Sequence, residues 1–160
     1  MIKEVCGALL QQPVDIIAHQ TNCRGVMGAG IAKQIKDYML SKRQYKQYVD
    51  MCRIQGSALL GQVQMMPLPN GQLIANCFGE DVPTGKGLDT NYEALKASLT
   101  KVCSYAKEHQ LSVGIPGLMG CGLAGGDWNI VREMIYEIFS EDTEVIISYF
   151  SEADYHKYNN

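Results

Sequence analysis

The sequence predicts an α/β fold, a three-layer α/β/α sandwich with a mixed, mostly parallel central sheet. Short runs rich in β-branched residues alternate with segments of helical periodicity, an order typical of strands covered by helices on both faces. One Asn-Gly pair lies between two adjacent strand-like runs and indicates an antiparallel hairpin within the sheet. The chain of 160 residues contains no linker and no internal repeat, so we expect a single domain over residues 1–160.

The first elements are two strands, a glycine loop and a helix. Residues Ile2–Cys6 form the first strand-like run, and Val14–Ala18 (VDIIA) form the second. The segment TNCRGVMGAG follows the second run. Next, Ile31, Ile35 and Met39 recur at a spacing of four, which places them on one face of a helix.

A second helix and a hairpin come next. Residues 42–55 are polar with apolar side chains at helical spacing, and Gly56 is placed to end that helix. The runs VQMMPLP and QLIANCF flank Asn70-Gly71, a dipeptide that tolerates positive φ at both centres of a tight turn. We therefore expect two antiparallel strands joined there.

The second half of the chain has the order loop, helix, strand, glycine loop, helix and strand. Residues 79–89 lack periodicity and predict an exposed loop, after which Thr90 and Glu93 form a capping-box pattern ahead of a helix. Residues 111–116 predict a strand, and GLMGCGLAGG is a second glycine loop. An amphipathic helix follows over residues 131–139. Residues 145–150 predict a last buried strand, before a polar tail.

The composition is that of an ordinary globular protein. A net charge of -3 and a pI near 5.6 supply no basic field, so long nucleic acid is not an expected partner except as a modified substrate. The six cysteines are scattered and no signal peptide precedes them, which favours reduced thiols in a cytoplasmic protein. No apolar run is long enough to cross a membrane. Without a Cys-x-x-Cys pair or clustered histidines, we predict no metal site and no cofactor.

Half of the sixteen glycines lie in two loops, and this clustering is the main functional signal. They are Gly25, Gly28 and Gly30 in the first loop and Gly117, Gly120, Gly122, Gly125 and Gly126 in the second. Each loop joins the carboxyl end of a predicted strand to a helix, where free backbone N–H groups and the helix dipole favour an anion. We expect the two loops to hold a diphosphate between them, whereas the alternative is that both are only tight turns.

Two common nucleotide motifs are missing from these loops. The spacing in GVMGAGIA is not the dinucleotide fingerprint G-x-G-x-x-G, and GCGLAGG matches it only approximately. The TGKG segment around Lys86 lacks the Ser or Thr that a P-loop needs for magnesium. These features disfavour a Rossmann-type oxidoreductase and an ordinary nucleotide triphosphatase.

Three segments of the chain carry a family resemblance. IIAHQTNCRGVMGAGIAKQI, NYEALKASL and IPGLMGCGLAGGDWNIVREMI together resemble the macrodomain family. The resemblance is greatest to the branch that contains the terminal ADP-ribose protein glycohydrolase and the yeast ADP-ribose-1''-phosphate phosphatase, and it covers nearly the whole chain. It implies a ligand of the ADP-ribose type.

The resemblance also implies roles for particular residues. The first loop would lie along the diphosphate and distal ribose, and the second would close over the diphosphate from the other side. Asn22 would reach the distal ribose, although an Asx turn is its structural alternative. From its place at the end of the last strand, we expect Phe150 to stack on adenine. The predicted ligand-binding residues are Asn22, Gly25, Val26, Met27, Gly28, Ala29, Gly30, Ile31, Gly117, Met119, Gly120, Cys121, Gly122, Leu123 and Phe150.

The sequence departs from the family pattern at two places. Most macrodomains carry an adenine-binding aspartate where this chain has Ala8, so adenine is held less specifically, another group such as Asp15 helps, or the ligand differs. The catalytic lysine and aspartate of the glycohydrolase branch are replaced by Cys77 or Phe78 and by Ala124. A lysine-linked covalent intermediate is therefore not expected, unless the loop that carries Lys86 brings this residue into the site.

The remaining catalytic candidates each have a structural alternative. Asp127 is placed to activate a water at the anomeric carbon, but it also precedes a helix and is a good N-cap. His19 is a candidate acid or base near the distal ribose, or else a satisfied core histidine. Lys86 is the third candidate. We expect an ADP-ribose-binding domain that hydrolyses ADP-ribosyl linkages or ADP-ribose-1''-phosphate, with a non-catalytic ADP-ribose reader as the alternative.

Overall fold

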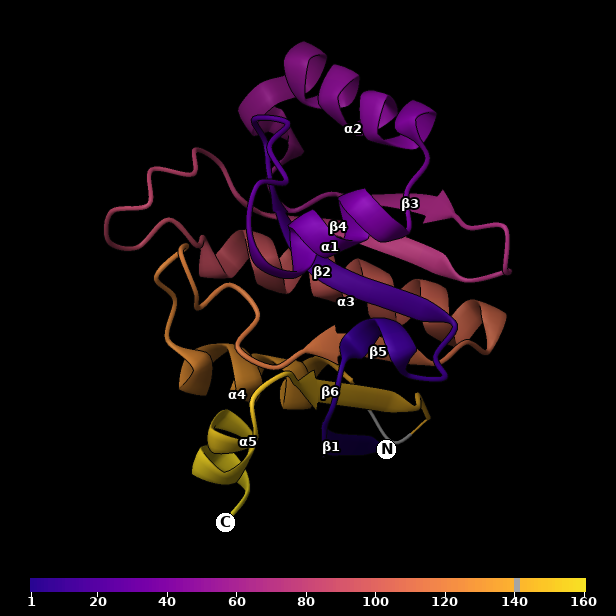
Figure 1. The fold of residues 1–160 in the computed structure, drawn as a ribbon, viewed down its shortest axis with the longest axis vertical. Coiled ribbons are helices and arrows are strands. Elements are labelled where there is room, and N and C mark those ends of the chain that lie inside the picture. The colour runs from indigo at the N-terminus through magenta and orange to yellow at the C-terminus, as the bar shows by residue number, and fades with distance from the viewer. Residues whose placement is uncertain (140–141) are drawn as a thin grey trace.

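The computed structural model describes residues 1–139 and 142–160, which form a six-stranded sheet between helical layers (Figure 1). The strand order is β1-β6-β5-β2-β4-β3, and β3 alone is antiparallel to its neighbour among the described strands. The predicted mixed, mostly parallel sheet is therefore confirmed. The strands are β1 (Ile2–Cys6), β2 (Ile16–Asn22), β3 (Val63–Pro67), β4 (Leu73–Glu80), β5 (Val113–Pro116) and β6 (Val145–Tyr149).

Helices cover both faces of the sheet. The α-helices are α1 (Gly30–Tyr38), α2 (Lys42–Gln55), α3 (Tyr92–His109), α4 (Trp128–Ile138) and α5 (Glu152–Asn159), with short 3-10 helices η1 (Leu9–Gln11) and η2 (Gly56–Leu59). Helices α3 and α4 pack on one face, whereas α1, α2 and η1 pack on the other. Figure 1 shows α3 behind the sheet and α1 in front of it. The three-layer prediction is confirmed.

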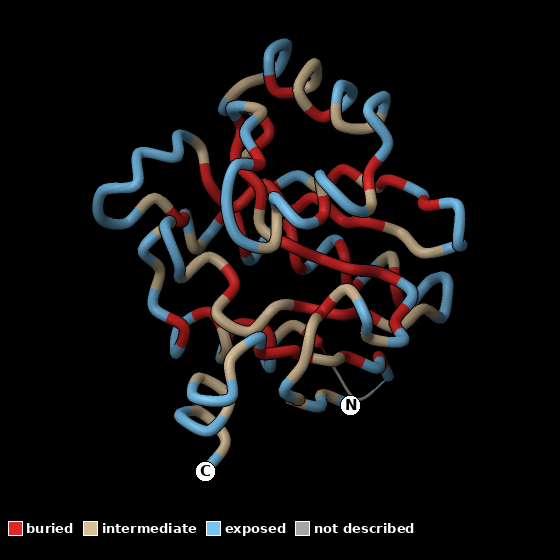
Figure 2. Tube along the Cα trace, viewed as in Figure 1, coloured by how far each residue is buried: buried red, intermediate tan, exposed pale blue. Residues whose placement is uncertain are grey.

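The alternation of side chains along β2 builds a separate core on each face. Ile16 and Ala18 point into the core formed with α3 and α4, and Ile17 points into the core formed with α1 and α2. The central strands are consequently buried along most of their length, as the red segments of Figure 2 show. A strand buried on both faces explains the continuous apolar run IIA in the sequence.

Strand β2 extends further toward its carboxyl end than predicted. It runs to Asn22 rather than ending at Ala18, because its pairing with β4 continues through Thr21 opposite Phe78 and Asn22 opposite Glu80. The register shifts between Thr21 and Asn22, so the strand ends in an irregularity. The strand thereby carries polar side chains to its carboxyl end.

Two local predictions of turn and cap chemistry were wrong. The hairpin loop is longer than a two-residue turn, since Leu68 N–H donates to the Gln72 carbonyl at 2.8 Å and, of the Asn70-Gly71 pair, Gly71 alone has a positive φ of 92°. Helix α3 is capped by Asn91, whose side chain accepts from Ala94 N–H at 3.0 Å. The cap is therefore one residue later than the predicted Thr90.

The polar tail contains a helix that was not predicted from the sequence. Ser151 caps α5 by accepting a hydrogen bond from Asp154 N–H, and Tyr155 and Tyr158 pack against the core beside Tyr149. Two aromatic rings hold this short, polar helix in place. No helix among the described residues is long and apolar enough to cross a membrane.

Candidate functional site

The two glycine loops face one cavity at the carboxyl ends of the parallel strands. Strands β2 and β5 are neighbours, but the chain leaves them for helices on opposite faces, α1 after β2 and α4 after β5. A reversal of this kind opens a crevice between the two connections. Here the crevice is a cavity of about 760 Å³ that both loops line, and this volume suits a ligand of nucleotide size.

Most of the predicted ligand-binding residues line this cavity. They are Asn22, Val26, Gly28, Ala29, Gly30, Ile31, Gly117, Met119, Gly120, Gly122, Leu123 and Phe150. The other three do not: Met27 is buried beneath the first loop, the Gly25 carbonyl accepts a hydrogen bond from the Tyr45 hydroxyl at 3.0 Å, and the Cys121 thiol lies 3.1 Å from the Met119 carbonyl. These three residues shape the loops from within the protein.

The N-terminus of α1 is open toward the cavity. Ala29 is its N-cap residue and supplies no side-chain hydrogen bond to the first turn. The side chains of Ser41, Asn91, Asp127 and Ser151 each accept an amide hydrogen at the start of α2, α3, α4 and α5. Among the described α-helices, α1 alone begins without such a cap. Its first amides and its dipole are therefore available to an anion in the cavity.

The cavity has an apolar end and a polar end because it crosses several strands in order. Above β1 and β6 it is lined by Gly7, Ala8 and Leu9 and by the Phe150 ring, which is 83% exposed. Above β2 and β4 it is lined by the polar side chains of Gln20, Asn22, Glu80 and Asp89. The glycine loops lie between these ends, so the cavity offers in sequence a place for a flat apolar ring, an anion and a hydroxyl-rich group.

Asp15 is not available to the apolar end. It directly precedes β2, at the amino-terminal end of the strand and away from the cavity. Its carboxylate accepts there from Ser112 N–H at 2.8 Å and from the Ser112 hydroxyl at 3.0 Å. The suggestion that Asp15 replaces the aspartate absent at Ala8 is therefore wrong. No acidic side chain lines this end of the cavity in the described part of the chain.

Asn22 holds the first loop in shape. Its Nδ2 donates to the Val26 carbonyl at 2.7 Å, and its Oδ1 accepts from Arg24 N–H at 3.0 Å. The Tyr48 hydroxyl donates to the Asn22 main-chain carbonyl at 2.8 Å. These contacts are those of the structural alternative, an Asx turn. Asn22 also lines the cavity, where the second Nδ2 hydrogen can still donate to a ligand.

His19 lies in the core, which is the structural alternative to its predicted acid-base role. The ring is fully buried. Its Nε2 lies 2.6 Å from the Oδ1 of Asn76, the residue opposite His19 on the neighbouring strand β4. Burial lowers the pKa of His19 to about 4, so the ring is neutral at physiological pH. The ring does not line the cavity.

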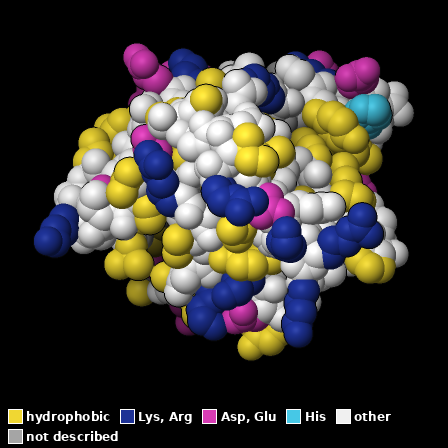
Figure 3. Space-filling view, turned by 90° about the horizontal axis from the view of Figure 1, so that it is seen from above, with side chains coloured by type: hydrophobic (Ala, Val, Ile, Leu, Met, Phe, Trp, Pro, Cys, Tyr) yellow, Lys and Arg dark blue, Asp and Glu magenta, His cyan; other side chains and the backbone are white. Residues whose placement is uncertain are grey.

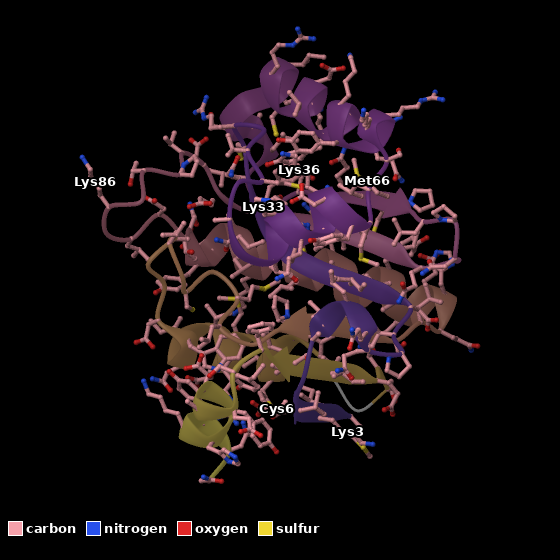
Figure 4. The ribbon with its side chains drawn as sticks, viewed as in Figure 1. Lys3, Cys6, Lys33, Lys36, Met66 and Lys86 are labelled. Atoms are coloured by element: carbon pink, nitrogen blue, oxygen red, sulfur yellow. The ribbon has the colours of Figure 1, made fainter. Side chains whose placement is uncertain are left out.

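The structure places the other two catalytic candidates outside the cavity. The Asp127 side chain caps α4 by accepting from Asn129 N–H at 2.9 Å. Lys86 is exposed at the tip of the 81–89 loop and points away from the protein (Figure 4). Of the positions that replace the family's catalytic pair, Cys77 and Phe78 are fully buried, and Ala124 lines the cavity with a methyl group.

Sequence reasoning missed the acidic and amide side chains at the polar end. Gln20 and Glu80 lie at strand ends, beyond the point where apolar alternation stops, and Asp89 closes the loop after β4. The Gln20 Nε2 donates to the Thr90 hydroxyl at 3.0 Å, which in turn donates to the Gly120 carbonyl at 2.6 Å. This chain of bonds ties β2 to the second glycine loop. The sequence did contain a signal for these residues, because polar residues directly follow the apolar runs of two predicted strands.

Basic side chains gather on one part of the surface. Residues 24–55 hold seven of the fourteen Lys and Arg but two of the seventeen Asp and Glu, which gives this segment a net charge of +5 and the rest of the chain -8. Figure 3, seen from above over α2, shows Lys and Arg spread across this face. The overall charge of -3 therefore hides a basic surface beside α1, and the charge argument against nucleic acid loses its force.

The fold and the cavity define an α/β domain with a nucleotide-sized cavity at the carboxyl ends of its parallel strands. The macro domain family model matches residues 18–135, so the chain belongs to the macro domain family. This confirms the resemblance inferred from the loops.

Curated relatives are distant and mostly longer. The DNA ADP-ribosyl glycohydrolase of Thermus aquaticus is 30% identical over 143 residues, which cover 86% of this chain and 37% of that protein. The ADP-ribose 1''-phosphate phosphatase of Saccharomyces cerevisiae is 32% identical over 99 residues, covering 58% and 55%. The chain therefore spans about half or less of the length of these relatives.

Solved structures share the fold over nearly the whole chain. A protein of unknown function from Bacteroides thetaiotaomicron has a TM-score of 0.81 at 25% identity, covering 94% of this chain and 98% of the other. The Thermosipho africanus DarTG complex with ADP-ribose has a TM-score of 0.72 at 19% identity, covering 89% and 40%. At this identity the second likeness concerns the fold alone.

Proposed function

We propose that this domain binds ADP-ribose and hydrolyses ADP-ribosyl linkages or ADP-ribose-1''-phosphate. The observation that carries the proposal is the order of groups along the cavity. An apolar end with an exposed aromatic ring, an uncapped helix N-terminus opposite a second glycine loop, and an end rich in amides and carboxyls match adenine, diphosphate and distal ribose in turn.

The hydrolytic part of the proposal draws on chemistry and on relatives. Two carboxyl groups, Glu80 and Asp89, line the end where the distal ribose would lie, and paired carboxyls are the usual catalysts of glycosidic hydrolysis. The names of the Thermus and yeast relatives describe removal of ADP-ribosyl groups from DNA and of a phosphate from ADP-ribose. The basic surface beside α1 favours a nucleic acid as one carrier of the modification.

A non-catalytic ADP-ribose reader is the second candidate. The observation that favours it is the apolar character of the positions that replace the family's catalytic lysine and aspartate: Cys77 and Phe78 are buried, and Ala124 has no functional group. A reader would retain the whole binding cavity and release no product.

Calorimetric titration and turnover assays separate these functions. ADP-ribose is expected to bind at least about tenfold, or about 1.4 kcal/mol, more tightly than AMP or NAD. ADP-ribosylated protein, ADP-ribosylated DNA and ADP-ribose-1''-phosphate are then incubated with the domain, and free ADP-ribose is quantified. Release from at least one of them supports the hydrolase, whereas tight binding without any release assigns the reader function. Equal affinity for all three nucleotides would remove the binding proposal itself.

A further inference from the structure

Glu80 is a nine-tenths buried residue that lines the cavity, and its carboxyl has no partner among the described residues. It ends β4 directly opposite Asn22 on β2, and the residue is 9% exposed. Its carboxyl oxygens have no hydrogen bond or ion pair within residues 1–139 and 142–160. By contrast, the Glu4 carboxyl, whose side chain is 5% exposed, is bonded to Arg132, Tyr136 and Tyr149. Glu80 is therefore not held there by a structural network.

A second carboxyl group, on Asp89, lines the same end of the cavity, and its pKa is shifted in the opposite direction. Burial, and next the charge of Asp89, raise the pKa of Glu80 above its ordinary value. The Thr84 hydroxyl, which donates to Asp89 at 2.6 Å, and Gly85 N–H, at 2.9 Å, lower the pKa of Asp89. Environments that push two neighbouring carboxyls apart in this way are typical of acid-base sites.

The Gln20 and Asn22 side chains line the same end of the cavity as these carboxyls. The Gln20 Nε2 donates to the Thr90 hydroxyl, and its Oε1 is buried against Gly79 and Gly120, so Gln20 shapes this end of the cavity. The unpaired Glu80 carboxyl and the second Asn22 Nδ2 hydrogen can bind a group with several hydroxyls. The distal ribose of the proposed ligand is such a group.

We propose that Glu80 is the general acid that protonates the leaving atom when an ADP-ribosyl linkage is cleaved. This inference rests on the proposed hydrolytic function. The Glu80 proton passes to the oxygen or nitrogen bonded to C1'' as that bond breaks, and the bonding electron pair leaves with this atom. A water molecule forms the new bond to C1'' and loses a proton to solvent, from which Glu80 is reprotonated. The products are ADP-ribose and the protonated leaving group.

Asp89 acts through Glu80 as a positioning residue. Its negative charge adds to burial in raising the pKa of Glu80, which favours the protonated form of the acid. Because Glu80 ends β4 beside Asn22 of β2, its proton is delivered from the strand ends that line this part of the cavity.

Glu80→Gln tests the assignment because it keeps the size of the side chain and removes its proton. On the best substrate found for the wild type, kcat should fall about 100-fold or more, with KM and the Kd for ADP-ribose changed less than about threefold. Glu93→Gln, which neutralises an exposed carboxylate on α3, is the matched control and should leave kcat unchanged. Thermal unfolding of each variant verifies that the fold is retained.

Asp89→Asn provides a readout that a purely structural role would not move. Removing this negative charge lowers the pKa of Glu80, so the fall in kcat at high pH should shift to lower pH while the maximal kcat is kept. Full activity of Glu80→Gln, or an unshifted profile in Asp89→Asn, overturns the assignment and leaves the proposed function standing. A wild type that binds ADP-ribose and turns over none of the substrates overturns both.

Discussion

The two glycine loops leave neighbouring parallel strands, but their glycines have different surroundings. In the second loop, a Cβ at Gly117 would overlap the Tyr149 ring, and one at Gly125 would overlap the Gly87 carbonyl oxygen. In the first loop, a Cβ at Gly28 would meet only Val26, at 3.5 Å. Internal packing therefore requires glycine at positions 117 and 125 of the second loop, whereas Gly28 of the first loop has open space above its backbone.

The helices that follow the two loops differ in whether a side chain caps their first turn. Helix α4 begins with Asp127, which satisfies one of its own amides, and α1 begins with Ala29, which satisfies none. Gly30 has a φ of 57°, and a Cβ added there would meet nothing within 4 Å, so this residue turns the chain into α1 without covering these amides. A glycine cluster in a sequence thus has two causes, and the absence of a side-chain cap on α1 marks the first loop as the one that we propose binds the anion.

Of the changes that test this difference between the loops, Gly28→Glu should have the largest effect on ADP-ribose binding. A carboxylate beside the diphosphate repels it and fills its place, so the Kd for ADP-ribose should rise about 100-fold or more. The fold should persist, because a Cβ at Gly28 makes only an ordinary contact. Calorimetry gives the affinity and thermal unfolding gives the stability.

Gln47→Glu is the control for charge alone, since it adds a carboxylate to an exposed position of α2 away from the cavity. Its affinity for ADP-ribose should match the wild type. If Gly28→Glu also binds normally, the anion does not lie at the first loop.

Sequence alone was sufficient for the fold because apolar periodicity marks its elements directly. It also located both glycine loops, since glycine clusters are visible without neighbours. It did not reveal why Gly117 and Gly125 are glycine, because Tyr149 and Gly87 reach them through tertiary contacts. The absent cap at Ala29 is visible in the sequence, but it gains meaning only once the cavity is known.

Sequence reasoning misjudged two residues whose environment is decided by pairing between strands. His19 is a core residue because the register places it opposite Asn76, more than fifty residues away in the sequence. Glu80 was assigned to a loop because apolar alternation ends before it, although its strand continues beside Asn22. Register between distant strands is not encoded in local periodicity, so neither position could be interpreted from its neighbours in the chain.

Ala29→Asp sharpens the comparison by giving α1 the cap that α4 has. Ala29 already has the extended backbone of an N-cap, so the free energy of unfolding without ligand should rise by about 0.5–2 kcal/mol. The same carboxylate occupies the amides that the diphosphate would use, and the Kd for ADP-ribose should rise about tenfold. Urea denaturation and calorimetry measure the two opposite changes.

Ala29→Ser separates capping from charge, because serine caps a helix without repelling an anion. A smaller loss of affinity than in Ala29→Asp is expected, again with a gain in stability. Should both variants become more stable while binding ADP-ribose as the wild type does, the α1 amides are not the anion site.

Asp127→Ala removes a helix cap, whereas Ala29→Asp adds one, and it should have the smallest effect on ADP-ribose binding. It removes the cap of α4, so the free energy of unfolding should fall by about 0.5–2 kcal/mol, as for other lost N-caps. Because the Asp127 side chain bonds to Asn129 N–H and does not line the cavity, the Kd for ADP-ribose and the turnover rate should stay within about twofold of the wild type. Urea denaturation, calorimetry and the turnover assay together decide between its two roles. A large loss of turnover with unchanged stability would instead make Asp127 catalytic, and α4 would then be a second functional helix end rather than the structural counterpart of α1.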